Sequence, residues 1–130
     1  MPVLPAEQML ACTMDYDSIQ KAGSGLGSGA VVVMDDTTCM VRACHRISRF
    51  YYKESCGQCT PCRVGTAKAA TLMEADVWDN QTLEDLNIVM TDASICGLGQ
   101  AAPNPVRCVQ KYFPHEIGPN NSFGKVGATA

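Results

Sequence analysis

The residues in this sequence whose types and spacing suggest a chemical function are cysteines in two short segments. Three lie at steps of three residues in ESCGQCTPCRVG, and a fourth lies downstream in ICGLGQAAPNP, giving C-x2-C-x2-C-x33-C. The four are Cys56, Cys59, Cys62 and Cys96. A tight turn, for which Gly57 gives the backbone freedom, brings the first three thiols to one side. Thiolates are ligands for soft metal centres, and four of them suit an iron–sulfur cluster best. The pattern therefore predicts electron transfer rather than hydrolysis or group transfer.

Other metal chemistry fits this pattern less well. The opening C-x2-C-x2-C matches bacterial [4Fe–4S] ferredoxins, but their nearby fourth Cys is missing and the remote Cys96 replaces it. Structural zinc is the main alternative, yet zinc sites usually pair two separated Cys/His dyads, whereas this chain has a triad and a single cysteine. Radical chemistry at an open cluster iron needs only three cysteines, so Cys96 as a fourth ligand favours a closed cluster. Arg63 and Lys53 beside the loop either tune the cluster's potential or belong to the helix surface.

The remaining residues that could do chemistry form no recognisable constellation. Four further cysteines have no ligand spacing among them, and we expect them to be buried free thiols: Cys12, Cys39, Cys44 and Cys108. We expect His45 to lie on a helix surface. No Ser/His/Asp or paired-carboxylate arrangement stands out, so we expect no catalytic residue in this chain.

Composition is typical of a soluble single-domain protein. The chain has 130 residues, enough for about one domain, and 46% of them are hydrophobic. The net charge is −3 and no dense basic cluster is present, which argues against nucleic-acid binding. The N-terminus lacks the features of a signal peptide, and the longest apolar run, 30–34, is far below the ~20 residues that span a bilayer. We therefore expect a cytoplasmic protein without membrane insertion, whose cysteines stay reduced.

Four amphipathic segments must position the cysteines. Apolar stripes predict helices over 36–53, 60–75, 82–92 and 104–113. Asp36 or Thr37 can cap the first helix, and Thr60 followed by Pro61 can begin the second directly at the cysteine loop. Thr82 can cap the third helix. These elements predict a mainly α fold, a small four-helix bundle that carries an iron–sulfur cluster.

The chain divides into three predicted regions. Residues 1–35 form a Gly-rich β segment, in which Ala30–Met34 is expected to be one buried strand. The glycines at 23–29 precede this strand and lack the P-loop lysine, so they predict a close-packed loop rather than a phosphate site. Residues 36–115 form the four-helix [4Fe–4S] domain, and residues 116–130 form a tail.

Two stretches of the sequence carry a resemblance to a known family. ESCGQCTPCRVGT at 54–66 and CGLGQAAPNPV at 96–106 resemble the cluster-binding signature of the NADH-binding flavoprotein family. That family includes the flavoprotein subunit of complex I, the diaphorase subunit of NAD-reducing hydrogenases and the β subunit of NAD-dependent formate dehydrogenases. The wording GLGQAAPNP is more similar to the last two branches. Residues 15–36 are similar to the segment leading into the cluster domain, at the end of a ubiquitin-like, soluble-ligand-binding-like β module.

The resemblance covers about 15–115 and implies a [4Fe–4S] cluster bound by Cys56, Cys59, Cys62 and Cys96 in a four-helix domain. Family members also carry a domain for FMN and NAD(H) with a GRGGAGFP-type motif, which this sequence lacks. The resemblance thus implies an electron-transfer module of an NAD-linked oxidoreductase. Its partners are an FMN- and NAD-binding part, on another chain or segment, and ferredoxin-like iron–sulfur subunits. A structural interaction module, held by zinc or a redox-silent cluster, is the alternative. An autonomous flavin or NAD enzyme is not expected in so short a chain. Formate, hydrogen and quinone stay open as terminal substrates.

Overall fold

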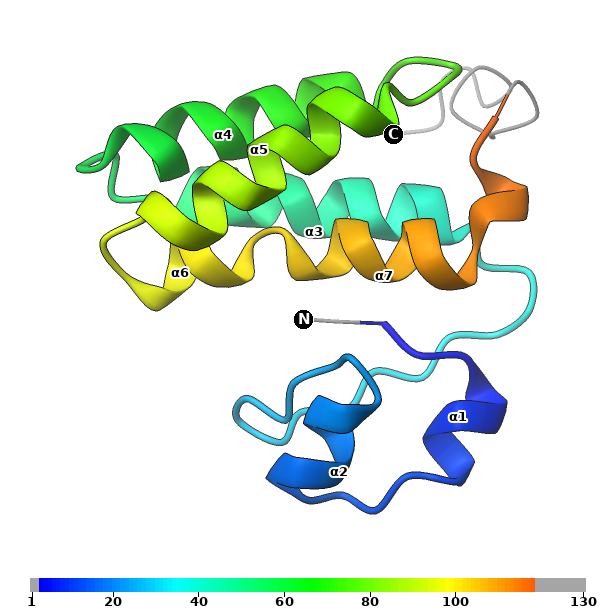
Figure 1. The fold of residues 1–130 in the computed structure, drawn as a ribbon. Coiled ribbons are helices and arrows are strands. Elements are labelled where there is room, and N and C mark those ends of the chain that lie inside the picture. Colours follow the sequence, from blue (N-terminus) through cyan, green and yellow to red (C-terminus); the bar gives the residue numbers. More distant parts are fainter. Residues whose placement is uncertain (1–2, 119–130) are drawn as a thin grey trace.

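The computed structural model describes residues 3–118, which are mainly helical and contain no strand (Figure 1). The helices are α1 (Ala6–Leu10), α2 (Tyr16–Lys21), α3 (Met40–Glu54), α4 (Thr60–Leu72), α5 (Asn80–Ala93), α6 (Gly97–Ala101), α7 (Asn104–Tyr112) and the 3-10 helix η1 (Pro114–Glu116). The predicted mainly α class is confirmed. Of the expected tail, residues 119–130 lie outside the described residues. No helix within 3–118 is long and apolar enough to cross a membrane.

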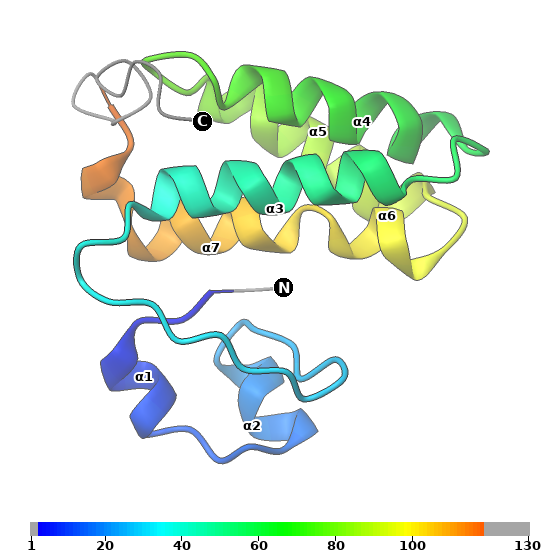
Figure 2. The ribbon, with the colours of Figure 1, turned by 180° about the vertical axis from the view of Figure 1, so that it is seen from behind.

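The longer helices pack side by side in one bundle. Helix α3 lies against α4 and α7, and α4 lies against α5. The chain reverses direction from α3 to α4 and again from α4 to α5, while α6 and α7 follow each other along the bundle (Figures 1 and 2). This up-and-down course brings the α3–α4 connection and the α5–α6 connection to the same end of the bundle (Figure 2). The bundle thus joins two segments that are far apart in the sequence.

A single apolar core holds these helices together. Its buried side chains come from every long helix and from the α4–α5 connection: Val41, Cys44, Ala69, Met73, Trp78, Leu83, Met90, Val106 and Val109. Burial of each large apolar side chain is worth about 1.5–3 kcal/mol relative to exposure. The buried indole of Trp78 donates its Nε1 hydrogen to the carbonyl oxygen of Met73 at 3.1 Å. Met73 and Trp78 of the α4–α5 connection are therefore part of the core, and the buried indole N–H has a partner.

Two of the helix starts differ from the sequence-based expectation. At α3, the capping group is Glu116 of η1, whose Oε2 accepts from the backbone N–H of Met40 at 2.7 Å. This cap comes from the far end of the chain, and the helix begins at Met40 instead of 36. At α5, the carboxylate of Asp79 accepts from Thr82 N at 3.0 Å, so Thr82 lies inside the helix instead of capping it. A carboxylate caps an N-terminus through its lone pairs and its charge, which explains both shifts.

The expected buried strand at Ala30–Met34 is not present. This run is extended but unpaired, and Val33 is 83% exposed. The segment before the bundle instead forms α1 and α2, on the side of α3 and α7 that faces away from α4 and α5 (Figure 1). Strand formation needs a neighbouring strand to satisfy the backbone, and no described residue supplies one here.

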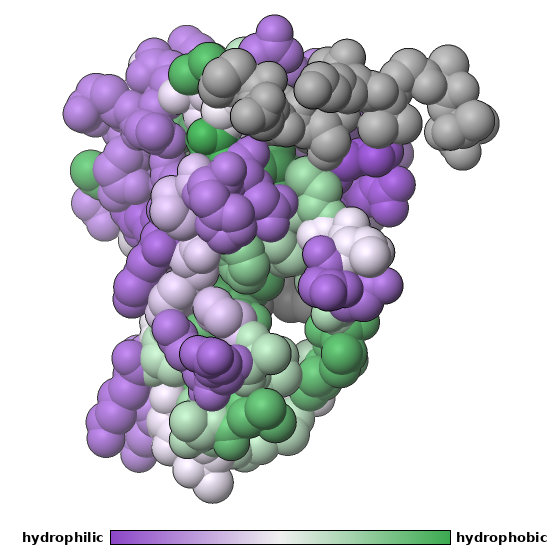
Figure 3. Space-filling view, turned by 90° about the vertical axis from the view of Figure 1, so that its right-hand side faces the viewer, coloured by the Kyte–Doolittle hydropathy of each residue, from purple (hydrophilic) through white to green (hydrophobic). Residues whose placement is uncertain are grey.

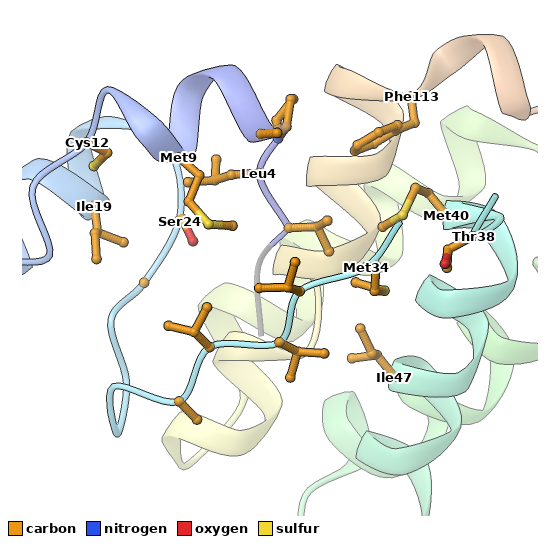
Figure 4. A pocket seen from close by; sticks show the side chains of 18 of the residues that line it. Leu4, Met9, Cys12, Ile19, Ser24, Met34, Thr38, Met40, Ile47 and Phe113 are labelled. Carbon is orange, nitrogen blue, oxygen red and sulfur yellow. The ribbon is translucent and has the colours of Figure 1, made fainter. Parts of the chain in front are cut away.

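The N-terminal segment contacts the bundle through Val3, which is buried in the core, and through two polar contacts. Tyr112 of α7 donates its hydroxyl to Ala22 O at 3.0 Å, and the Cys108 thiol lies 3.6 Å from Gly23 O. Between the segment and the bundle lies an open pocket of about 580 Å³. Met34 of the segment and Ile47 of α3 line it together (Figure 4). Hydrophobic side chains gather over this part of the surface, beside a hollow (Figure 3).

Candidate metal centre

The two cysteine segments meet at one end of the bundle. Cys59 is the residue before the first turn of α4, Cys62 lies in that turn, and Cys96 is the residue before α6. Helix α6 packs against both α4 and α5, which brings the second segment onto the first. A Cβ on Gly99 of α6 would lie 3.0 Å from the Cβ of Cys62. The structure therefore places the remote cysteine segment beside the triad, as the sequence pattern required.

The turn that carries the first cysteines is held by its own hydrogen bonds. Gly57 adopts a φ of 74°, in the left-handed region that favours glycine. Ser55 Oγ accepts from the backbone N–H of Gly57 at 3.2 Å and lies 3.3 Å from the sulfur of Cys62. Arg63 donates to the carbonyl oxygen of Gly57 and, at 3.2 Å, to the hydroxyl of Thr60. Arg63 thus binds the turn itself instead of pairing with an acid, and its positive charge lies at the cysteine loop.

The four thiols differ in their exposure to solvent. Cys62 is 4% exposed, Cys59 is half-buried, and Cys56 and Cys96 are exposed. Protein atoms thus cover the centre on the α4 side, while the other two cysteines lie at the protein surface. None of the four forms a disulfide. All four sulfurs are therefore available as ligands.

The protein favours the thiolate form at Cys59. The backbone N–H of Ile95 is the largest cause of a lowered Cys59 pKa, followed by the backbone N–H of Cys62. The Ser94 hydroxyl makes the smallest contribution, because it faces Cys59 without reaching good hydrogen-bond geometry with any atom of residues 3–118. Cys59 also lies at the N-terminus of α4, where the helix dipole favours an anion. Because the thiolate is the form that binds metal, Cys59 is prepared to act as a ligand, and the largest single contribution comes from the second cysteine segment.

These residues fit an iron–sulfur cluster in chemistry and in placement. The site offers four free thiols, a lowered pKa at one of them and a buried serine hydroxyl without a protein partner. Within residues 3–118, no three His, Cys, Asp or Glu side chains converge closely enough to hold a single metal ion. A four-iron cluster holds its thiolates further apart than one ion does. The four cysteines therefore fit a cluster because they lie at the same end of the bundle, and they do not form a tight cage around a single ion.

The other four cysteines lie away from this end. Cys44 is fully buried, and burial raises its pKa to about 12. Cys108 is buried and has a raised pKa for the same reason. Cys12 and Cys39 are half-buried, so only part of the expectation of buried thiols holds. Cys44 and Cys108 are small apolar parts of the core rather than reactive groups.

The expectation for His45 was wrong. His45 is 6% exposed in α3, and its Nε2 lies 3.1 Å from a carboxylate oxygen of Glu74. Burial lowers the pKa of His45, while Glu74 acts in the opposite direction. Its helix neighbours Arg46 and Arg49 are exposed, but His45 itself is buried beside Glu74, which follows the end of α4. The packing partner, which the sequence of α3 does not contain, decides the burial.

Sequence reasoning also missed Ser55, Ser94 and the helix α6. Ser55 directly precedes Cys56 in the sequence, and Ser94 precedes Cys96 by two residues. A hydroxyl this near a ligand is a usable signal because second-shell donors orient and tune metal ligands. Glycines at 97 and 99 disfavour a helix, which is why α6 was not predicted.

A family model described as the NADH-ubiquinone oxidoreductase-F iron-sulfur binding region, NADH_4Fe-4S, matches residues 42–120. The chain belongs to this family. The resemblance to NADH-binding flavoproteins is thereby confirmed, and so is the [4Fe–4S] cluster as the cofactor.

Known relatives agree with this membership. The chain is 40% identical over 123 residues to the F 1 subunit of the NADH-quinone oxidoreductase of Rhizobium meliloti (strain 1021), and 41% identical over 123 residues to the F subunit of the same enzyme of Rickettsia rickettsii (strain Sheila Smith). Each match covers 90% of this chain but only 28% and 29% of the two relatives. An NAD+-reducing [NiFe]-hydrogenase in its H2-reduced state is similar in structure, with a TM-score of 0.61 and 36% identity over 70% of this chain and 16% of that one. The chain therefore spans less than a third of the proteins it matches.

Proposed function

We propose that this chain passes single electrons through a [4Fe–4S] cluster held by Cys56, Cys59, Cys62 and Cys96. The observation that carries this proposal is the meeting of the two cysteine segments at one bundle end, where the Ile95 N–H lowers the pKa of Cys59. When bound, such a cluster takes up and releases one electron at a time. The described residues contain no His, Cys, Asp or Glu cluster around a single ion, and we assign no residue of this chain to a catalytic step.

The protein residues around the cysteines have three tasks in this proposal. The turn at Gly57 sets the spacing of the first three thiols. Arg63 holds that turn by donating a hydrogen bond to the carbonyl oxygen of Gly57. Backbone N–H groups and the α4 N-terminus favour the thiolate form of Cys59. The exposed Cys56 and Cys96 put one edge of the site at the surface, where an electron can reach a partner over a short distance.

The proposed partners are the other parts of an NAD-linked oxidoreductase. The relatives are named as F subunits of NADH-quinone oxidoreductase and as an NAD+-reducing hydrogenase, and this chain corresponds to less than a third of them. We infer that an FMN- and NAD(H)-binding part lies on a different segment or chain, and that ferredoxin-like iron–sulfur subunits exchange electrons with this one. A formate dehydrogenase role and a cytoplasmic location stay predictions.

Cluster content tests the proposal directly. The chain purified without oxygen should be brown and contain about four irons and four sulfides per chain, as a [4Fe–4S] cluster requires. Serine in place of any one of the four ligands should lower the iron content. Cys12→Ser, a half-buried cysteine of the N-terminal segment, is the matched control and should keep it. A colourless protein loaded with zinc would overturn the proposal.

A structural role for the metal is the second candidate. Cys59 and Cys96 stand directly before α4 and α6, so a metal that joins them would also fix two helix ends. The two functions separate in a Cys96→Ser complex with its redox partners. Loss of electron transfer to the natural acceptor, with NAD-linked dye reduction retained, supports the relay. Retained turnover with the natural acceptor supports the structural role.

A further inference from the structure

The hydroxyl of Ser94 is the unexplained polar group at the cysteine end of the bundle. Ser94 is 6% exposed, and its Oγ has no hydrogen-bond partner within residues 3–118. The one other such side-chain atom in the described part of the chain is Oδ1 of Asn87. Burying a hydroxyl without a new hydrogen-bond partner lowers the stability of the fold by about 1–3 kcal/mol, because its hydrogen bonds with water are lost. A partner for Ser94 is therefore expected at this place.

The main chain holds Ser94 firmly in position. Its N–H donates to the carbonyl of Met90 at 3.3 Å, which ends α5. Its carbonyl accepts from the side chain of Gln100 at 3.1 Å, which links it to α6. Both ordinary backbone hydrogen bonds are thus used, and the side chain is free to serve another group.

The side chain of Ser94 lies between α6 and the first turn of α4. A Cβ on Gly99 would lie 2.6 Å from the Cβ of Ser94, in collision with its Oγ, and 3.0 Å from the Cβ of Cys62. Gly99, Ser94 and Cys62 are therefore immediate neighbours. Only a residue without a Cβ at 99 leaves room for the hydroxyl beside the cysteines.

We propose that Ser94 Oγ donates a hydrogen bond to a sulfur of the cluster, and that this bond raises the cluster's reduction potential. The proposal rests on the proposed function, since it needs the cluster at this site. The reduced cluster carries one more negative charge than the oxidised cluster, so a donor stabilises the reduced form more. Ser94 is a positioning and tuning residue, not a ligand.

Ser55 provides a precedent within the same site. Its hydroxyl lies 3.3 Å from the sulfur of Cys62 and accepts from the backbone N–H of Gly57, so its own hydrogen is available to that sulfur. Ser55 precedes the triad and Ser94 precedes the fourth cysteine. The two cysteine segments thus each bring one serine to the sulfurs.

The test is a redox titration, followed by electron paramagnetic resonance, of the full 130-residue chain carrying its cluster. Ser94→Ala should shift the midpoint potential to a more negative value. Loss of one hydrogen bond to a charged group should change the ratio of reduced to oxidised cluster about tenfold at a fixed potential, which is about 59 mV for one electron. Ser94→Thr keeps the hydroxyl and should restore most of the potential.

Ser48→Ala is the matched control. Ser48 is 4% exposed, and its hydroxyl lies 3.9 Å from the sulfur of Met73, past the opposite end of α4 from the cysteines. The Ser48→Ala substitution removes the same hydroxyl oxygen from an equally buried position, and it should leave the reduction potential unchanged. An equal shift in Ser48→Ala, or an unchanged potential in Ser94→Ala with full iron content, overturns the proposal.

A second variant tests the inference if the Ser94→Ala protein does not take up a cluster. Gly99→Ala keeps every cysteine and the serine but displaces the Ser94 hydroxyl. It should lower the potential in the same direction, and an unchanged value overturns the inference. Iron content of the unchanged chain is read separately. A chain without iron contradicts the proposed function, whereas a full cluster with an insensitive potential contradicts only the role of Ser94.

Discussion

The N-terminal segment, residues 3–39, and the bundle, residues 40–118, use the same apolar residue types with opposite results. Val31 and Val33 are 56% and 83% exposed, whereas Val41 and Val109 are 0% exposed. An apolar side chain stabilises a fold only when a second apolar surface covers it. In the bundle each helix has such a neighbour. In the segment, α1 and α2 are too short to bury each other's apolar sides. Apolar character alone therefore does not predict which region is the core.

The junction of the two regions shows the same difference. The pocket of about 580 Å³ lies where the segment meets α3 and η1, and its lining includes Met9, Met34, Ile47 and Phe113. Ile47 and Phe113 belong to the bundle, while the methionines come from the segment (Figure 4). Val3, which is buried in the core, and the polar contacts to Ala22 and Gly23 join the segment to the bundle.

Leucine truncation should separate the two regions most strongly. Leu83 of α5 is fully buried, and Leu83→Ala should lower the free energy of unfolding by about 2–5 kcal/mol because it leaves a cavity. Leu10 is 88% exposed, and Leu10→Ala should change it by less than about 0.5 kcal/mol. Urea denaturation followed by circular dichroism measures both. Equal losses would contradict the division into a core and an uncovered segment.

Removing the remote cap should have the next largest effect. Glu116→Ala deprives the Met40 N–H of its acceptor and should cost about 0.5–2 kcal/mol, with fraying at the start of α3. Amide hydrogen exchange at Met40 and Val41 reports that fraying. Glu7→Ala, in the first turn of the short α1, is the control and should leave α3 protected. An unchanged exchange rate in Glu116→Ala would show that Glu116 does not cap the helix.

The link between the regions should have a smaller and more local effect. Tyr112→Phe removes the hydrogen bond to Ala22 O, which is worth about 0.5–1.5 kcal/mol. Hydrogen exchange should rise within α2 and the following turn, while the core of α5 stays protected. Tyr16→Phe, at a tyrosine that is 70% exposed, is the matched control. Faster exchange throughout α5 would mean that the two regions unfold together.

The smallest expected effect is on the pH dependence of stability. Burial lowers the pKa of His45 below its ordinary value of 6.5, so the unfolded chain binds a proton more readily than the folded one. The contribution of His45 is therefore fully present above about pH 6.5 and is lost as pH falls toward the lowered pKa. His45→Gln should flatten the fall in melting temperature over this acidic range. His115→Gln, at an exposed histidine, should keep the wild-type slope.

The helices illustrate how far sequence reasoning reaches. Their apolar stripes located α3, α4, α5 and α7 to within a few residues, because a helix side chain pattern is a local property. The start of α4 followed from Thr60 and Pro61 to within one residue, since the N-cap is Cys59 and Thr60 is the first helical residue. The start of α3 did not, since its cap is Glu116, 76 residues away. The prediction of a strand at Ala30–Met34 was wrong, because residues with a high β propensity form a strand only where a neighbouring strand pairs with them.

By itself, the sequence determined the ligand set that we propose and the family to which the chain belongs. Spacing within a short motif fixes which thiols can face one centre, and it does so without any tertiary contact. The tertiary structure alone decided what surrounds those thiols. It brought the Ile95 N–H to Cys59, buried His45 beside Glu74 and placed Ser94 beside Gly99. Each of these needs two segments that only the packing of the bundle brings together, and hydrogen bonds and desolvation act over a few ångströms in space rather than along the chain.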